Sequence, residues 1–136
     1  AIAGVAVSKQ TLNENVKITH ELDSAGLEVS ADKKQISQVL INLVKNSMEA
    51  LKDNDEGIIS IKGESGENGR VQITVTDNGP GIPGEIMDKI FVPFFTTKES
   101  GSGIGLSLSR QIMLLHGGRL KVISKPNVQT VFTLEF

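Results

Sequence analysis

The sequence predicts an α+β fold, a two-layer sandwich in which helices pack on one face of a mixed, mostly antiparallel sheet. Two segments, 33–52 and 105–116, place apolar residues three and four positions apart, as amphipathic helices do. Shorter segments around them alternate apolar and polar residues, as strands do. The order strand, helix, hairpin, helix, hairpin indicates helices that cover a sheet. A chain of 136 residues is long enough to bury one substantial core.

The first part of the chain is predicted to form a strand and a long helix. Alternation over 15–22 favours a strand, 23–26 favours a turn, and 27–30 is compatible with a second short strand. Asp32 is a good N-cap, because its carboxylate can accept hydrogen bonds from backbone N–H groups in the first turn of a helix. The helix over 33–52 follows directly.

The remaining elements follow from turn residues and alternation. Residues 63–69 contain three glycines and are expected to form a turn, and 78–104 is rich in Gly, Pro, Ser and Thr, with a short helix near 84–90. The helix over 105–116 ends at Gly117, since glycine readily adopts the left-handed conformation found at helix C-termini. Four short segments are predicted to pair as two hairpins: 58–62, 71–77, 120–124 and 130–136.

Composition narrows the classes of function. The net charge of −2 argues against general nucleic-acid binding, because no basic excess exists to neutralise phosphates. The absence of cysteine excludes disulfides, thiolate metal sites and a Cys nucleophile, and it suits a reducing compartment. No apolar run approaches the roughly 20 residues of a membrane helix, so we expect no membrane contact by this domain. Residues 1–14 are expected to be an N-terminal linker or edge segment, and 15–136 to be one domain.

The strand that ends at Asp77 carries a carboxylate that points inward. Side chains two residues apart in a strand share a face, so Asp77 lies on the same side as the apolar Val75. A buried carboxylate is costly unless hydrogen-bond donors satisfy it. Two interpretations stay open: Asp77 caps the next turn through the amide of Gly79, or it accepts a hydrogen bond from a ligand's amino group. In the second case Gly79 and Gly81 let the backbone approach a flat ring closely.

Three polar residues lie along one flank of the helix over 33–52. At about 100° per residue, Asn42, Asn46 and Glu49 fall within a sector of roughly 60° beside the apolar face. Asn is a poor helix former, so two amides one turn apart call for an explanation. They form either a solvated flank with local hydrogen bonds or a row of oxygens that faces a pocket. Such oxygens suit Mg²⁺, which prefers oxygen ligands and shares its coordination with water and phosphates.

A glycine-rich loop leads directly into the helix over 105–116. Glycines stand at 101, 103 and 105, and Lys98 precedes them. Helix N-termini expose unpaired N–H groups and a positive dipole end, which together bind phosphate. A flexible linker has a similar composition, so this pattern has two interpretations by itself. It is neither a P-loop nor a dinucleotide-binding fingerprint, because the spacing of its glycines differs from both.

Four segments resemble, in order, the sequence motifs of one family. Residues 38–47 resemble its N box, 77–82 its first glycine box, 91–98 its F box and 101–108 its second glycine box. The chain therefore resembles the catalytic, ATP-binding domain of bacterial two-component sensor histidine kinases. This family belongs to the GHKL ATPase superfamily, with gyrase, a heat-shock chaperone and mismatch-repair ATPases. The resemblance covers residues 15–136 and implies the GHKL ATP-binding fold.

The resemblance implies a site for ATP and Mg²⁺. In it Asn46 is a ligand of the Mg²⁺ that bridges the ATP phosphates, and Asn42 lies beside it. Asp77 accepts a hydrogen bond from the adenine amino group, which selects ATP over GTP because guanine carries a carbonyl there. Thr130 supports the adenine through its hydroxyl group. Asn42, Asn46 and Lys98 are the implied catalytic residues.

The resemblance implies further contacts at both ends of the nucleotide. Gly79, Gly81 and Ile82 lie beside the adenine. Lys98 and the second glycine box hold the phosphates from a mobile lid. The nucleotide-binding residues of that box are Gly101, Gly103, Gly105 and Leu106.

The implied enzyme is a histidine protein kinase whose phosphoacceptor is absent from this chain. Hydrolytic branches of the superfamily carry Glu at the position of Asn42, and an amide cannot act as that base, so we expect ATP to be held with little turnover. His20 lies in a strand pattern, and His116 is a helix C-terminal residue placed to interact with the helix dipole. The γ-phosphoryl group is therefore expected to pass to a histidine on a separate dimerisation hairpin, and a response regulator acts downstream.

Two other functions stay open on the sequence. A stand-alone protein serine kinase or anti-sigma-type regulator would act largely by binding a partner. An ATPase module of the chaperone or topoisomerase type would turn over ATP, against which Asn42 argues. In the favoured interpretation the fragment is a monomer, the domain is cytoplasmic, and its parent protein can be membrane-anchored. Glu49, where many relatives carry a basic residue, departs from the family pattern.

Overall fold

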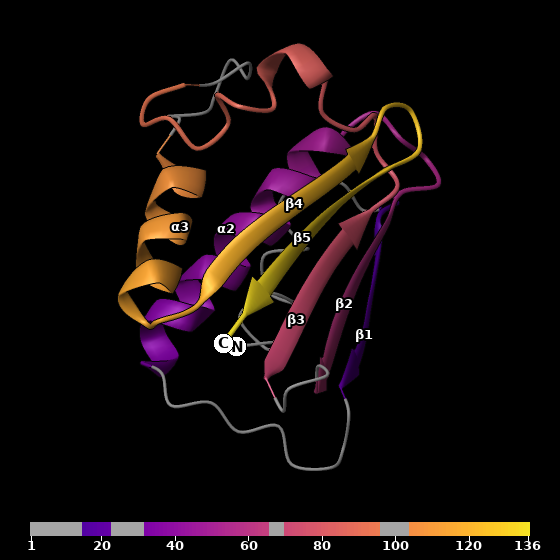
Figure 1. The fold of residues 1–136 in the computed structure, drawn as a ribbon. Coiled ribbons are helices and arrows are strands. Elements are labelled where there is room, and N and C mark those ends of the chain that lie inside the picture. Colours follow the sequence, from indigo (N-terminus) through magenta and orange to yellow (C-terminus); the bar gives the residue numbers. More distant parts are fainter. Residues whose placement is uncertain (1–14, 23–31, 66–69, 96–103) are drawn as a thin grey trace.

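The computed structural model describes residues 15–22, 32–65, 70–95 and 104–136. Within these ranges two α-helices cover one face of a five-stranded sheet, so the predicted fold class is confirmed (Figure 1). None of the helices in these ranges combines the length and the apolar character that a bilayer span requires. In chain order the elements are β1 (Lys17–Leu22), α2 (Lys33–Ala50), β2 (Ile58–Ser65), β3 (Val71–Asp77), the 3₁₀ helix η2 (Gly84–Ile86), α3 (Gly105–Leu115), β4 (Arg119–Lys125) and β5 (Gln129–Glu135).

The sheet is mixed and mostly antiparallel, as predicted. Its strand order is β1-β2-β3-β5-β4, with β1 and β2 parallel and the other three pairings antiparallel. The parallel pair is the one joined through α2, because a helical crossover returns the chain to the same end of the sheet. β3 and β5 pair although α3 and β4 lie between them in the sequence. This pairing brings the end of β3 beside the start of β5.

Most predicted elements are confirmed with ends that differ by one or two residues, but the first hairpin turn is shorter than predicted. The sequence predicts a turn over 63–65, because this segment contains Gly and Ser. In the structure these residues continue β2 instead. Gly63 pairs with Ile73 and Ser65 with Val71, so the ladder to β3 overrides the local turn preference. The possible strand over 27–30 lies outside the described residues.

The short helix predicted near 84–90 is wrong beyond its first turn. Only Gly84–Ile86 forms a helix, η2, and it is of the 3₁₀ type. The following backbone bonds join residues three apart, such as the N–H of Lys89 to the carbonyl of Ile86 at 2.9 Å. This stretch is therefore a series of tight turns, in which an α-helical ladder does not develop.

The core lies between α2 and the sheet. Asp32 caps α2 as predicted, because its Oδ1 accepts from the N–H groups of Lys34 (2.9 Å) and Gln35 (3.3 Å). The polar Ser47 lies in the buried stripe of α2. The apolar residues of that stripe are Ile36, Val39, Leu40, Leu43, Val44 and Met48. They share one cluster with Ile59, Ile61, Val75, Phe132 and Leu134 of the sheet.

His116 ties the end of α3 to the start of α2. Its Nε2 accepts from the backbone N–H of Asp32 at 3.1 Å, so Nδ1 carries the hydrogen and donates to the carbonyl of Ile112 at 2.8 Å. The predicted position at the C-terminus of the helix is confirmed. The bond to the Ile112 carbonyl places the ring at the carbonyl end of the helix, as the predicted dipole interaction requires, and the bond from Asp32 adds a bridge to α2.

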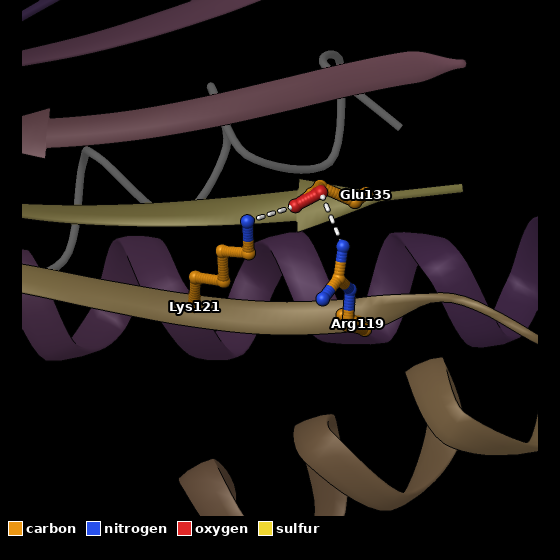
Figure 2. A network of polar contacts seen from close by, with 3 residues as sticks. All are labelled: Arg119, Lys121 and Glu135. Atoms are coloured by element: carbon orange, nitrogen blue, oxygen red, sulfur yellow. Dashed lines mark hydrogen bonds and ion pairs between the residues drawn. The ribbon is translucent and has the colours of Figure 1, made fainter. Parts of the chain in front are cut away.

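An ion-pair cluster with a buried carboxylate and two exposed cationic side chains stabilises the far end of β5. Glu135 is 4% exposed and lies directly across the sheet from Arg119. Figure 2 shows that both Lys121 and Arg119 on β4 reach its carboxylate, the latter with Nη2 3.4 Å from Oε2. The hydrogen bond from Lys121 lowers the pKa of Glu135 below its ordinary value, and the nearby arginines add to that effect against the opposing influence of burial. The ionised carboxylate therefore stabilises the pairing of the last two strands.

We expect Glu135→Gln to lower the free energy of unfolding by about 1–2 kcal/mol at neutral pH, because a buried amide cannot form either ion pair. The folded-state pKa lies below the ordinary value of 4.5, so the stabilisation is present above 4.5 and is lost as the pH falls through the folded-state pKa. The difference between wild type and variant should therefore shrink in acid. Urea unfolding at neutral pH and at about pH 3 measures both quantities.

The exposed pair between Lys62 and Glu64 provides the matched control. Its nitrogen–oxygen distance is 3.7 Å and its side chains are 52% and 45% exposed. Glu64→Gln should change the free energy of unfolding by less than about 0.5 kcal/mol, since water screens such pairs. A deficit in Glu135→Gln that stays constant between the two pH values would contradict the assigned role of the carboxylate.

Candidate nucleotide-binding site

Asp77 lies at the centre of the predicted site, at the end of β3. Its side chain is buried, with 2% of the residue exposed. Oδ1 accepts from the backbone N–H of Gly79 at 2.9 Å, and Oδ2 accepts from the hydroxyl of Ser47 at 2.8 Å. The turn-capping interpretation is therefore confirmed. It does not exclude ligand binding, because an ionised carboxylate offers about four acceptor positions.

Thr130 is the direct cross-strand neighbour of Asp77. It lies near the start of β5, is 5% exposed and pairs with Asp77 in the antiparallel ladder. Directly opposed residues in such a ladder point to the same face of the sheet. Two of the predicted adenine-binding residues, 53 positions apart in the sequence (130 − 77), thus lie side by side.

Gly79 is held close to the carboxylate that it hydrogen-bonds. A Cβ added at Gly79 would lie 2.9 Å from Oδ1 of Asp77 and 3.4 Å from the Cβ of Ala50 on α2. The first distance is shorter than real Cβ contacts, so a side chain would displace the carboxylate or the loop. The glycine is needed for the fold of the loop itself.

Gly81 anchors the same loop to the turn between β4 and β5. Its φ is +76°, and an added Cβ would lie 2.8 Å from both the carbonyl oxygen of Lys125 and the hydroxyl of Ser124. The N–H of Ile82 donates to the Ser124 hydroxyl at 2.7 Å. The loop is also held by the N–H of Asn127, which donates to the carbonyl of Pro80 at 2.7 Å. The two glycines and Ile82, predicted to border adenine, thus lie in a loop with a defined conformation.

The amides predicted on the flank of α2 are both half-buried, and Asn42 connects α2 to α3. Its Nδ2 donates to the hydroxyl of Ser109 at 3.2 Å and to the carbonyl of Gly105 at 3.4 Å. Asn42 is therefore part of the contact between the helices, and a purely solvated flank is excluded for it. Asn46 follows one turn later on α2. Glu49 faces Lys52 at 3.9 Å.

The N-terminus of α3 lies beside Asn42, which brings two predicted parts of the phosphate site together. Gly105 is the first residue of α3 and Leu106 the second, and both are half-buried. The N-cap residue is Ile104, whose apolar side chain offers no hydrogen-bond acceptor. The first N–H groups of a helix lack partners inside the helix and attract anions. Lys98, Gly101 and Gly103 lie outside the described residues.

The donor set of the described residues fits Mg²⁺ only together with a phosphate ligand. No group of three or more His, Cys, Asp or Glu that could hold a metal occurs in the described ranges. Asn46 offers an amide oxygen, a hard donor of the kind that Mg²⁺ accepts. Mg²⁺ commonly binds through one or two protein oxygens and takes its other ligands from water and substrate phosphates.

Sequence reasoning missed Ser47 and two other side chains that organise the site. Ser47 stands at a buried position of the α2 stripe, where apolar periodicity leads one to expect an apolar residue, and that break in the pattern is the available signal. Ser109 is buried and receives the bond from Asn42. Asn78 accepts from the N–H of Ile58 at 2.7 Å and so ties the loop after β3 to β2. Neither Ser109 nor Asn78 could be assigned a partner from local spacing.

The comparisons with known proteins agree with this geometry. The family described as histidine kinase-, DNA gyrase B-, and HSP90-like ATPase matches residues 31–136. The chain belongs to this family. Its resemblance to sensor histidine kinases is confirmed, and the domain is an ATP-binding catalytic domain of the histidine protein kinase type.

The similar proteins are sensor kinases and their catalytic domains. The C4-dicarboxylate transport sensor protein DctB of Rhizobium meliloti is 39% identical over 110 residues, which cover 81% of this chain and 18% of DctB. The solved catalytic domain of histidine kinase ThkA is 37% identical with a TM-score of 0.81, and the match covers 99% of this chain and 90% of that one. ThkA in complex with the response regulator protein TrrA matches at 36% identity and a TM-score of 0.77, over 99% and 38% of the two chains. This chain therefore spans about a fifth of the length of DctB.

We expect Gly81→Ala to lower the free energy of unfolding by about 2–3 kcal/mol, because it adds backbone strain and a steric overlap at once. Gly117→Ala separates the two effects, since Gly117 has a φ of +72° but open space around an added Cβ. Its cost should be about 1 kcal/mol. Urea unfolding of each variant measures these values.

Gly84→Ala is the control without strain or overlap. Nothing lies within 4 Å of an added Cβ there, so its effect should stay within about 0.5 kcal/mol. If Gly81→Ala proved no more destabilising than Gly117→Ala, the docking of the loop on the β4–β5 turn would be weaker than the distances indicate.

Proposed function

We propose that this domain binds Mg²⁺-ATP and donates the γ-phosphoryl group to a histidine on a separate dimerisation hairpin of a longer sensor kinase. The observation that carries the proposal is the buried carboxylate of Asp77. It lies beside Thr130 in the sheet and is hydrogen-bonded from α2 and from its own loop. Membership of the ATPase family supports a nucleotide as the ligand.

At the adenine end, Asp77 accepts a hydrogen bond from the exocyclic amino group. Guanine carries a carbonyl at the corresponding position, so it would oppose an acceptor to an acceptor, and such unpaired buried groups cost the most in recognition. Thr130 offers a hydroxyl on the same face of the sheet. Gly79, Gly81 and Ile82 form the loop that borders the base.

At the phosphate end, the proposed catalytic residues are Asn46, Asn42 and Lys98. Asn46 supplies an oxygen ligand to Mg²⁺, which when bound neutralises the charge on the phosphates. Asn42 holds the start of α3 in place through its bonds to Gly105 and Ser109. The remaining phosphate contacts come from Lys98 and from the backbone at Gly101, Gly103, Gly105 and Leu106.

The proposed reaction rests on positioning, with little covalent work by the protein. Asn42 stands where a hydrolytic relative needs a base, and its amide is engaged with α3, so water is not activated there. ATP therefore waits for a protein nucleophile.

Neither histidine of this chain fits the role of that nucleophile. His20 lies in β1, and His116 bridges two helices through both ring nitrogens. The acceptor is then a histidine on the hairpin of the parent kinase, and the phosphoryl group passes from it to a response regulator. ThkA has been solved in complex with a response regulator, which supports a response regulator as a partner.

The proposed setting follows from the same chemistry. ATP as co-substrate places the reaction in the cytoplasm, whether or not the parent protein is membrane-anchored. The domain itself acts as a monomer, because dimerisation belongs to the hairpin. DctB and the sensor histidine kinase ZraS of Escherichia coli are sensor proteins, which favours the sensor kinase over the stand-alone serine kinase or anti-sigma alternative.

Calorimetric titration with a non-hydrolysable ATP analogue and Mg²⁺ tests the adenine end. We expect the wild type to bind, and Asp77→Asn to weaken binding by roughly tenfold to a hundredfold. The substitution replaces a charged group with two acceptor oxygens by a neutral amide, in which one oxygen becomes an NH₂ donor. A GTP analogue should bind far more weakly than the ATP analogue. Asp88→Asn, the same change at an exposed turn residue, should leave the affinity unchanged. Equal affinity of wild type and Asp77→Asn would remove Asp77 from the site.

Mixing the domain with the purified hairpin of its parent kinase and labelled ATP tests the transfer itself. We expect an acid-labile, base-stable phosphohistidine on the hairpin, and a loss of roughly a hundredfold or more in rate for Asn46→Ala. Acid-stable phosphoserine would support the serine kinase alternative. Rapid ATP turnover without the hairpin would instead support an ATPase of the chaperone or topoisomerase type.

A further inference from the structure

Ser47 is an unusual residue at its position in α2. It is fully buried and lies in the apolar stripe, between Val44 and Met48, which are also fully buried. A hydroxyl group at such a position costs free energy unless it is hydrogen-bonded, and an alanine would fill the site without that cost. The hydroxyl therefore needs an explanation in terms of its partner.

The partner of Ser47 is the proposed adenine-reading group. Its hydroxyl donates to Oδ2 of Asp77 at 2.8 Å, across 30 residues of sequence and from the helix layer to the sheet. The other oxygen, Oδ1, accepts from Gly79 at 2.9 Å. A carboxylate rotates broadly about its last side-chain bond when it is unrestrained. Two donors on opposite oxygens fix that rotation and hence the plane of the carboxylate.

We propose that Ser47 is a positioning residue for adenine recognition, which orients the Asp77 carboxylate towards the exocyclic amino group. This inference rests on the proposed function. Ser47 acts through Asp77 and needs no contact with the nucleotide. Hydrogen bonds are strongly directional, so an acceptor whose plane is fixed in advance discriminates better than one that must be ordered on binding.

A purely structural hydrogen bond would have a different signature. It would lower the stability of the fold, and it would weaken all purine nucleotides by the same factor. If Ser47 is a positioning residue, its loss weakens only the hydrogen bond between Asp77 and the amino group, and so lowers the affinity only of nucleotides that carry this group. The quantity that separates the two is the ratio of dissociation constants for two non-hydrolysable triphosphate analogues. One carries adenine, and the other carries unsubstituted purine, which lacks the amino group.

The experiment measures this ratio by calorimetry with Mg²⁺ in wild type and Ser47→Ala. We expect the wild type to prefer the adenine analogue, and Ser47→Ala to lose roughly tenfold of that preference, the effect of one hydrogen bond to a charged group. Affinity for the purine analogue should stay within about twofold of wild type. Ser37→Ala is the matched control, because it makes the same change on the same helix about 15 Å away along its axis.

A second variant keeps the test valid if Ser47→Ala folds poorly. Ser47→Cys is nearly isosteric and keeps a weaker donor, so it should show a smaller loss of the same preference. Thermal unfolding of the unliganded variants measures how far each substitution destabilises the fold. The ratio of the two affinities does not depend on this destabilisation, because both analogues bind the same folded protein.

The outcomes separate this inference from the function on which it rests. If wild type binds neither analogue, or binds both equally, adenine recognition by Asp77 fails and Ser47 has nothing to position. If wild type prefers adenine and Ser47→Ala keeps that preference, or weakens both analogues alike, the proposed function stands and the positioning role of Ser47 is overturned.

Discussion

The buried carboxylate of Asp77, a residue that is 2% exposed, determines much of this structure. Asp77 cannot lie between sheet and helices without donors, because an unpaired buried charge costs several kcal/mol. Its donors come from two different layers, Ser47 in the helix layer and Gly79 in the loop after β3. Helix, sheet and loop must therefore lie within hydrogen-bond distance of one point. The contacts that make the charge tolerable in the fold are also those that would aim it at a ligand.

The loop after β3 likewise has a role in the fold and a proposed role in ligand binding. Gly79 leaves room for the carboxylate of Asp77, and Gly81 leaves room for the turn between β4 and β5. Both glycines are thus explained by packing within the domain, and the same conformation would border the base in the proposed site. A side chain at either position would move the loop before it could reach a bound base. Glycine is therefore required even in the unliganded domain.

The two helices hold each other in place at the proposed phosphate end of the site. At one end of α3, Asn42 bonds to Gly105 and Ser109, and at the other end His116 bonds to Asp32 at the start of α2. α3 is thus held near both of its ends, which fixes where its N-terminal N–H groups point. Anion binding at a helix N-terminus depends on that direction, because the dipole effect falls off within the first turn. Asn42 contributes to the proposed site through this placement of α3 as much as through any contact of its own.

Local sequence determined the helices, the helix cap and the buried faces of the strands, because these features depend on residues that are close together in the chain. Helical periodicity gave α2, the short side chain of Asp32 gave its cap, and alternation along β3 placed Asp77 on the buried face. These features could be predicted because backbone geometry alone sets the direction of a side chain relative to its neighbours. The resemblance to a family then assigned roles to residues of the four motifs and to Thr130, and those that the structure describes lie on α2, α3, the loop after β3 and the paired ends of β3 and β5.

Only the tertiary structure decided which distant groups meet. The extension of β2 through Gly63 to Ser65 depends on its ladder with β3, and the pairing of Asp77 with Thr130 depends on β5 joining the centre of the sheet. The bond from Ser47 to Asp77 depends on how α2 packs across the sheet. The Ser47–Asp77 bond joins residues 30 positions apart, and the Asp77–Thr130 pair joins residues 53 positions apart (130 − 77). These contacts arise from packing of whole layers, which local spacing along the chain does not encode.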